Sequence, residues 1–281
     1  MWLLGTIHVG DERTAYLPAE IRTAFESADA LALECNTEAF EQQIEEDEAL
    51  QAQVAQAYYY TDGTTMEQLL EAEEYARAVQ FMKATGNYNE NMLVAKPYLW
   101  SNAIDQFYLR QGQTLHSDQG VEEWLMDWAQ ELEKPIWEVE SSLFQMQMLT
   151  GFSQDIQLML LKNSMETSFR ENWEGTVELY EKWCAGDEAV LREYLAEPVG
   201  TSDMTEEELA EYEAYKPLIE EYEKTIGFDR NIGMLNVAIQ YLESGDTVFY
   251  AVGLAHLLDA ENGLVDALRE AGYTVELVAY Q

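Results

Sequence analysis

The sequence Trp2-Leu3-Leu4-Gly5-Thr6-Ile7-His8-Val9 opens the chain with a short apolar run that Gly10 closes. Its length and boundaries are typical of a buried β-strand. A helical pattern follows, because Pro18 precedes apolar residues at helical spacing. Residues 30–33 form a second apolar run, which Glu34 ends. A strand, a helix and a strand in this order predict a βαβ unit with parallel strands.

The other end of the chain has the same alternation. Residues 247–252 form an apolar, β-branched and aromatic run, and Gly253 and His256 follow it. This composition is typical of a strand. A helix is then predicted over residues 261–271, and a last strand over residues 273–280.

Between these ends, from about residue 37 to residue 230, the pattern is mostly helical, with one short strand expected at residues 135–140. Helical stretches are expected over residues 41–60, 66–83, 97–111, 121–132, 143–183 (as one or two helices) and 205–224. The last of these has an acidic, solvated face and should be interrupted at Pro217. We therefore predict a single α/β domain over residues 1–281. Its central mixed sheet comes from the N- and C-terminal segments and is covered by the large helical middle region.

The charge of the chain excludes some classes of partner. Its 281 residues include 54 Asp and Glu but only 15 Lys and Arg, which gives a formal net charge of −39. We expect no binding to nucleic acid, because that affinity depends on basic residues that neutralise phosphates. An anionic membrane surface is disfavoured for the same reason. No apolar run reaches the roughly 18 residues of a transmembrane helix. The two cysteines, Cys35 and Cys184, could form at most one disulfide.

Two of the three histidines lie in the same local context. His8 follows Gly5, and His256 follows Gly253, each by three residues and each at the end of an apolar run. Glycine allows close backbone approach at a strand end, so each imidazole is expected at the sheet edge where α/β proteins bind ligands. The alternative is a hydrogen-bonded core or rim histidine with no chemical role. The third histidine, His116, is interpreted as a loop residue.

Two acids and one arginine are further candidates. Glu34 ends the second apolar run, so parallel strands would place it at the same edge as His8. It could ligate a metal, act as a general base or orient an imidazole, or it could be a solvated acid. Glu140, at the end of the short middle strand, has the same alternatives. Arg230 could bind a substrate carboxylate, stabilise an oxyanion or pair with structural acids.

A series of short motifs, each weak alone, recurs in a fixed order along nearly the whole chain. They are Leu3–Gly10, Leu31–Glu34, Gly120-Val121-Glu122, Lys134-Pro135 through Glu140 to Gln145, Trp183–Asp187, Arg230-Asn231, Val252–Leu257 and Gly263 through Gly272 to Val275. Their order resembles the TraB/GumN family, which includes pheromone-shutdown proteins of plasmids and the TIKI metalloproteases of animals. Glu122 stands where the family has aspartate, and we assign no role to it here.

The resemblance implies a fold of the erythromycin-esterase/ChaN-like type, with two Gly-x-x-His motifs facing one cleft. It also implies a peptidase that depends on a divalent metal, Mn²⁺ or Co²⁺ first and Zn²⁺ as a further option. Carried over by position, His8, His256 and Glu34 would hold the metal, with Glu34 as an alternative general base. Glu140 and Arg230 would support the reaction. The substrate would be a peptide or protein.

Two other functions fit the same motifs. One is a protein that sequesters a peptide without cleaving it, as is suggested for the pheromone-shutdown relatives. The other is an esterase-like hydrolase without metal, in which a histidine acts as the base. The resemblance favours an exported or cell-envelope location, although the first residues lack the pattern of a signal peptide.

Overall fold

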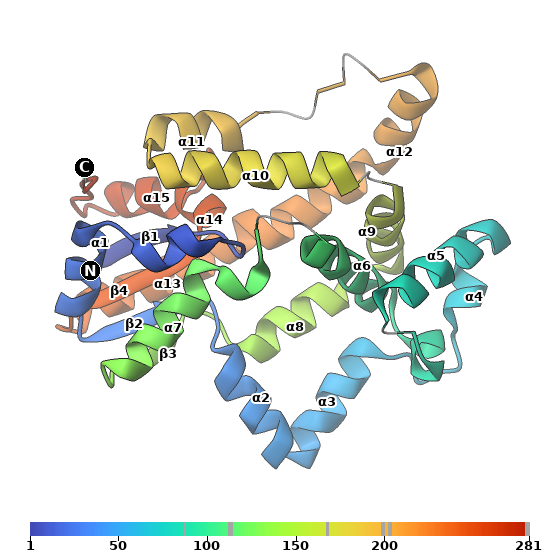
Figure 1. Ribbon diagram of the computed structural model, residues 1–281, viewed down its shortest axis with the longest axis horizontal. Helices are drawn as coiled ribbons and strands as arrows, with labels where there is room; N and C mark the ends of the chain where they lie inside the picture. Colours follow the sequence, from blue (N-terminus) through green and yellow to red (C-terminus); the bar gives the residue numbers. More distant parts are fainter. Residues whose placement is uncertain (87, 112–114, 167–168, 198–199, 202–203, 279–281) are drawn as a thin grey trace.

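A parallel sheet joins the two ends of the chain. The computed structural model describes residues 1–86, 88–111, 115–166, 169–197, 200–201 and 204–278. Within these residues the sheet has four strands, in the order β1 (Trp2–Thr6), β4 (Val248–Gly253), β2 (Ala30–Leu33) and β3 (Ile136–Glu138). Figure 1 shows the N-terminal and C-terminal segments side by side in this sheet. The predicted α/β fold with a sheet from both chain ends is therefore confirmed.

The direction and order of the strands differ from the prediction in two respects. Every described strand pair is parallel, so the sheet is parallel and not mixed. Strands β1 and β2 are parallel as predicted, but β4 lies between them and pairs with both. Crossover connections that contain helices return the chain to the same end of the sheet each time, which keeps the strands parallel.

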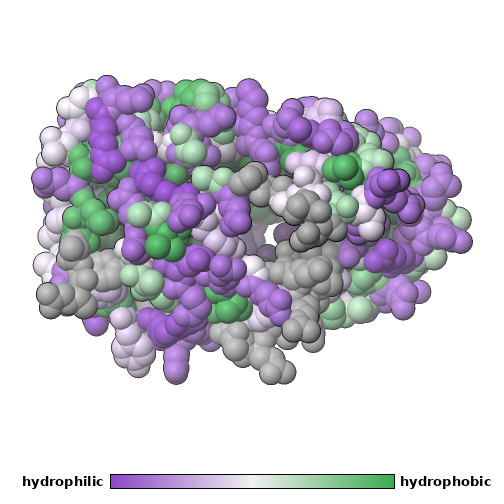
Figure 2. Space-filling model, turned by 90° about the horizontal axis from the view of Figure 1, so that it is seen from above, coloured by the Kyte–Doolittle hydropathy of each residue, from purple (hydrophilic) through white to green (hydrophobic). Residues whose placement is uncertain are grey.

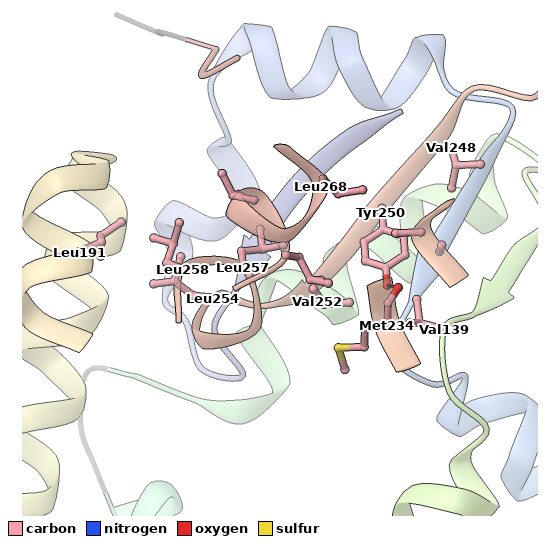
Figure 3. Packing of buried hydrophobic residues seen from close by; sticks show 14 residues of the cluster. Val139, Leu191, Met234, Val248, Tyr250, Val252, Leu254, Leu257, Leu258 and Leu268 are labelled. Atoms are coloured by element: carbon pink, nitrogen blue, oxygen red, sulfur yellow. Dashed lines mark hydrogen bonds between the residues drawn. The ribbon is translucent and has the colours of Figure 1, made fainter. Parts of the chain in front are cut away.

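Alternate residues of β4 enter two different apolar layers. Val248, Tyr250 and Val252 pack with helices α13 (Arg230–Glu243), α14 (Leu254–Leu258) and α15 (Leu264–Glu270), as Figure 3 shows. Phe249 and Ala251 pack on the opposite face with α1 (Ala19–Ser27) and α7 (Val121–Glu131). Burial on both faces explains why the β4 sequence is apolar throughout rather than alternating.

The middle of the chain forms a second, helical layer. Its α-helices include α2 (Thr37–Glu46), α3 (Glu48–Tyr58), α4 (Met66–Leu69), α5 (Ala72–Thr85), α6 (Pro97–Gln111), α8 (Ser142–Gly151), α9 (Gln154–Glu166), α10 (Phe169–Ala185), α11 (Glu188–Leu195) and α12 (Glu206–Glu223). Short 3₁₀ segments are η1 (Glu12–Tyr16), η2 (Glu90–Val94) and η3 (Ser117–Gln119), and η4 (Lys224–Asp229) is a π-helical turn. Trp100 and Ile104 of α6 pack against Leu161 of α9 in a core of their own. In Figure 1, α4 and α5 lie at the end of the molecule farthest from the sheet.

Local capping explains where the predicted long helices divide. The Asp47 side chain accepts hydrogen bonds from the amides of Ala49 and Leu50, so it ends α2 and begins α3. Glu71 forms a capping box at the start of α5, which separates it from α4. Conversely, α12 continues through Pro217, and its predicted interruption is wrong. No residue of α12 is buried, so water can reach the carbonyl group that Pro217 leaves without a donor.

The predicted last strand is absent from the described residues 273–278, and residues 279–280 lie outside the described part. The chain turns at Gly272, whose φ is 96°, and then runs without pairing to a strand. The Arg269 guanidinium donates to the Val275 carbonyl group instead. The first strand is also shorter than predicted, since it ends at Thr6.

Both cysteines are free thiols, so no bridge joins them. Burial raises the pKa of the Cys35 thiol to about 11. None of the described helices has the length and apolar character needed to cross a membrane. Figure 2 shows hydrophilic residues over much of one face, in keeping with the high net charge.

Candidate functional site at the carboxyl edge of the sheet

The strand register brings the candidate residues to one edge. Thr6 of β1 pairs with Gly253 of β4, while Leu33 of β2 pairs with Ala251 of β4 and with Glu138 of β3. His8, His256, Glu34 and Glu140 each follow the end of one of these strands. Parallel strands therefore place all four side chains at the carboxyl edge of the sheet, which is where ligands bind in open α/β sheets.

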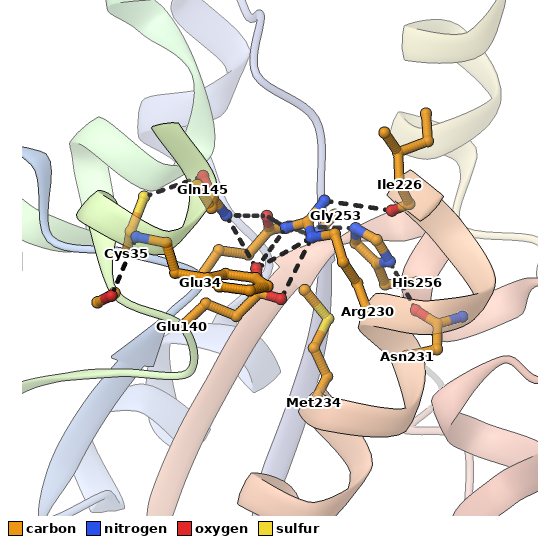
Figure 4. Close-up of polar contacts among 12 residues, drawn as sticks. Glu34, Cys35, Glu140, Gln145, Ile226, Arg230, Asn231, Met234, Gly253 and His256 are labelled. Atoms are coloured by element: carbon orange, nitrogen blue, oxygen red, sulfur yellow. Dashed lines mark hydrogen bonds and ion pairs between the residues drawn. The ribbon is translucent and has the colours of Figure 1, made fainter. Parts of the chain in front are cut away.

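A buried ion-pair cluster lies at the centre of this edge (Figure 4). Arg230 Nη2 lies 2.6 Å from Glu34 Oε2 and 2.7 Å from Glu140 Oε2, and Arg230 Nε donates to Glu140 Oε2 at 3.0 Å. Gln145 Nε2 donates to the same two carboxylates, at 3.1 Å and 3.2 Å. One arginine thus holds together two acids that come from different strands.

The charges in this cluster keep Glu34 ionised. Burial alone would raise the pKa of Glu34, but the nearby His256 and Arg230 and the Gly253 amide outweigh it and lower that pKa. The two Glu34 oxygens have different neighbours. Oε2 binds Arg230, whereas Oε1 accepts a 2.7 Å hydrogen bond from the Gly253 amide and faces His256. Oε1 is therefore the Glu34 oxygen that is not bound to Arg230 and that lies on the side of His256.

His256 is buried and held at one ring nitrogen. Its Nδ1 lies 2.6 Å from Asn231 Oδ1, and its Nε2 lies 3.9 Å from Glu34 Oε1. Burial lowers the pKa of His256 and outweighs the opposite effect of Glu34. The imidazole is thus neutral at physiological pH and has Nε2 directed toward a carboxylate.

His8 has a different environment at the same edge. Its Nδ1 lies 2.8 Å from Glu122 Oε1 at the start of α7, and its side chain is 75% exposed. The hydrogen bond with Glu122 raises the pKa of His8 to about 9. The charge of His8 also contributes to the lowered pKa of His256. The two Gly-x-x-His histidines are therefore electrostatically coupled but differ in burial and charge.

The two glycines of the repeated motif serve close packing. A Cβ on Gly5 would lie 2.6 Å from Leu254 Cδ1, and one on Gly253 would lie 3.1 Å from Glu34 Oε1 and 3.5 Å from the His256 ring. The first glycine lets α14 pack onto β1. The second lets the carboxylate and the imidazole approach the strand.

Three polar residues of the site were not predicted from the sequence. Glu122 pairs with His8. Gln145 contacts Glu34, and Asn231 contacts His256. The glycine two residues before Glu122 was the sequence feature that could have indicated its role. Gly120 lets the start of α7 approach the His8 backbone, since a Cβ on it would lie 3.2 Å away. The backbone of the third histidine, His116, pairs with that of Gly10.

The residues predicted to hold a metal fit that role in part. His256 Nε2 and Glu34 Oε1 are 3.9 Å apart, a spacing that two ligands with bonds of about 2.0–2.2 Å to one ion can have. Asn231 and Glu122 hold the Nδ1 atoms of the histidines as outer partners of metal-bound imidazoles do. However, in the part of the chain that the structure describes, no three His, Cys, Asp or Glu side chains are grouped so that they could hold an ion together.

A close backbone contact fixes the His8 segment. Gly10 exchanges two hydrogen bonds with His116, and a Cβ on Gly10 would lie 2.1 Å from the Gln119 carbonyl oxygen. We expect Gly10→Ala to lower the free energy of unfolding by about 1–3 kcal/mol, because the backbone must shift. Urea denaturation followed by circular dichroism measures this loss. Gly151→Ala is the matched control, since its Cβ would meet no atom within 4 Å. Equal stability of the two variants would contradict the prediction.

A parallel sheet whose carboxyl edge gathers two histidines, three glutamates and an arginine places the protein among α/β proteins with a polar site at the ends of their strands. The TraB/PrgY/gumN family model matches residues 1–277, and the chain belongs to this family. No curated protein and no solved structure matches the chain.

Proposed function

We propose that the protein is a hydrolase of peptide bonds whose reacting groups are the Nε2 atoms of His8 and His256, assisted by Glu34. The observation that carries this proposal is the shared arrangement of the histidines. In each, Nδ1 lies against a side-chain oxygen, at 2.6 Å or 2.8 Å, so that Nε2 is left for chemistry. Held imidazoles of this kind act as general bases or as metal ligands.

In this proposal, each residue of the ion-pair cluster has a task. Glu34 Oε1 would stabilise positive charge that develops on His256, because the two groups are 3.9 Å apart. Arg230 would keep Glu34 ionised, while Gln145 would orient Glu34 and Glu140 would hold Arg230 in place. The family supports peptides as the substrate class. The net charge of −39 would favour cationic peptides by long-range attraction.

A divalent metal, Mn²⁺ or Co²⁺ first and Zn²⁺ next, is the cofactor that we propose, with His8, His256 and Glu34 as the residues that would hold it. When bound, such an ion lowers the pKa of a water molecule and polarises a carbonyl group. His8 would then have to give up its proton to the solvent, because only a neutral imidazole is a ligand.

A second candidate, hydrolysis without metal, is favoured by the opposite environments of the two histidines. His256 is buried, which lowers its pKa, whereas the exposed His8 lies 2.8 Å from Glu122, which raises the pKa of His8 to about 9. A neutral imidazole and a protonated one at the same edge are suited to act as general base and general acid. His256 would take the proton of the attacking water, and His8 would protonate the leaving amine.

One experiment separates these functions and the sequestering alternative. The protein is purified without chelator, its metal content is measured, and the cleavage of fluorescein-labelled casein is followed before and after dialysis against EDTA. Loss of cleavage with EDTA and recovery with Mn²⁺ would support the metal-dependent form. Cleavage unchanged by EDTA would support the second candidate. Binding of labelled peptides with no cleavage under any of these conditions would contradict a hydrolase.

A further inference from the structure

A chain of side-chain amides leads away from His256 to the backbone of a neighbouring turn. His256 Nδ1 contacts Asn231 Oδ1 at 2.6 Å, and Asn231 is only 1% exposed. Asn231 Nδ2 in turn contacts Asn262 Oδ1 at 3.0 Å. Asn262 Nδ2 lies 2.8 Å from the carbonyl oxygen of Phe228. Figure 4 shows Asn231 between the α13 backbone and the His256 ring.

The direction of each hydrogen bond in this series follows from the Phe228 carbonyl group at its end. A backbone carbonyl group can only accept, so Asn262 must direct its amino group at Phe228 and its oxygen at Asn231. Asn231 must then direct its amino group at Asn262 and its oxygen at His256. The backbone carbonyl of Asn262 lies 3.4 Å from Asn231 Nδ2, a longer contact that favours the same orientation. The Phe228 carbonyl, acting through the Asn262 side chain, is the main constraint on both amides.

We infer that Asn231 and Asn262 are positioning residues that hold neutral His256 in the tautomer with the proton on Nδ1. The lone pair of the imidazole then lies on Nε2, the nitrogen 3.9 Å from Glu34 Oε1. The catalytic meaning of this tautomer rests on the proposed function, while the tautomer itself does not. Asn262 touches neither Glu34 nor the ion-pair cluster in any described hydrogen bond, so its role is exerted through Asn231.

The Phe228 carbonyl group, which fixes the two amides, lies next to the site. Phe228 belongs to the π-helical turn η4, which directly precedes Arg230 and Asn231. Turns of this type occur often at functional sites. Asn262 is itself fixed, because its backbone amide donates to Asp259 Oδ1 at 3.0 Å. The turn therefore supplies the carbonyl group that sets the tautomer, and the arginine of the ion-pair cluster follows directly after it.

The tautomer can be measured without turnover. The full chain is labelled with ¹⁵N-histidine and kept free of metal, and long-range ¹H–¹⁵N correlation spectra are recorded near neutral pH. The chain has three histidines, and the His256 signals are those missing from His256→Gln. We expect a protonated Nδ1 and an unprotonated Nε2, with the other tautomer at roughly a tenth or less of the population.

Two variants of Asn262 test whether this residue sets the tautomer of His256. Asn262→Leu removes the anchor, so the Asn231 amide can turn over and donate to Nδ1; we expect the Nε2-protonated tautomer to rise at least several-fold. Asn262→Asp also loses the bond to Phe228, but its carboxylate can only accept, so Asn231 must still donate to it and the wild-type tautomer should be retained. Glu261→Gln, on the same turn and exposed, is the matched control. A wild-type His256 protonated on Nε2, or an Asn262→Leu variant with the wild-type spectrum, would overturn the inference. Since no step requires substrate, an inactive protein would contradict only the proposed function.

Discussion

Replacing His256 by glutamine should lower the rate of peptide hydrolysis by roughly 10²–10⁴-fold, the usual loss when a general acid–base group is removed. Glutamine retains polarity and hydrogen bonding but cannot take a proton. If the metal-dependent form holds, the variant should also lose bound metal, because one imidazole ligand is gone. The measurement is the initial rate of cleavage of fluorescein-labelled casein, together with the metal content of the same sample.

His116→Gln is the control for this prediction, because His116 is the one histidine not assigned to the site. Its backbone pairs with Gly10, and a change of side chain leaves that pairing intact. We expect its rate to equal that of the wild type. Thermal unfolding of both variants verifies that they are folded. Rates of His256→Gln and His116→Gln within twofold of each other would place the reaction elsewhere in the molecule.

The second large effect concerns stability. Arg230→Ala should lower the free energy of unfolding by about 3–5 kcal/mol, because it leaves two buried carboxylates without their common partner. The side chains of Arg230, Glu34 and Glu140 are only 11%, 14% and 7% exposed, so the two carboxylates are largely shielded from bulk water. Urea denaturation followed by circular dichroism gives the difference from the wild type.

An exposed arginine provides the matched comparison. Arg13 also binds two acids, Asp11 and Glu181, but its side chain is 45% exposed. Arg13→Ala should therefore cost only about 0–1 kcal/mol. Adding Glu140→Gln to Arg230→Ala should restore part of the lost stability, since one uncompensated charge is removed. A loss in Arg230→Ala no larger than in Arg13→Ala would show that burial of the cluster is not what makes it stable.

The sequence predicted those parts of the site that depend on local pattern. An apolar run followed by a polar residue marks a strand end, and this placed His8, Glu34, Glu140 and His256 correctly at one edge. Which of these side chains contact one another could be learned only from the folded structure. No sequence rule indicates that Arg230 would bridge two of these acids, because the three residues meet only through the strand order.

Other features could not be predicted because they arise from tertiary contacts. The interaction of Glu122 with His8 depends on how closely α7 approaches β1, which Gly120 allows. The parallel pairing of β4 between β1 and β2 is a choice among several strand orders that the same apolar runs permit. The predicted helix boundaries were wrong where a single capping residue such as Asp47 interrupts a continuous helical pattern.

The central position of β4 has a consequence for how the protein is made. Trp2 pairs with Phe249, and β1 and β2 have no contact in the sheet until β4 lies between them. During synthesis, β2 can pair with β3 of the middle region, but β1 remains unpaired until almost the whole chain has left the ribosome. Sheets that depend on such distant pairings form slowly and expose aggregation-prone edges meanwhile. We expect chains that stop before residue 248 to be retained by chaperones rather than to accumulate as folded protein.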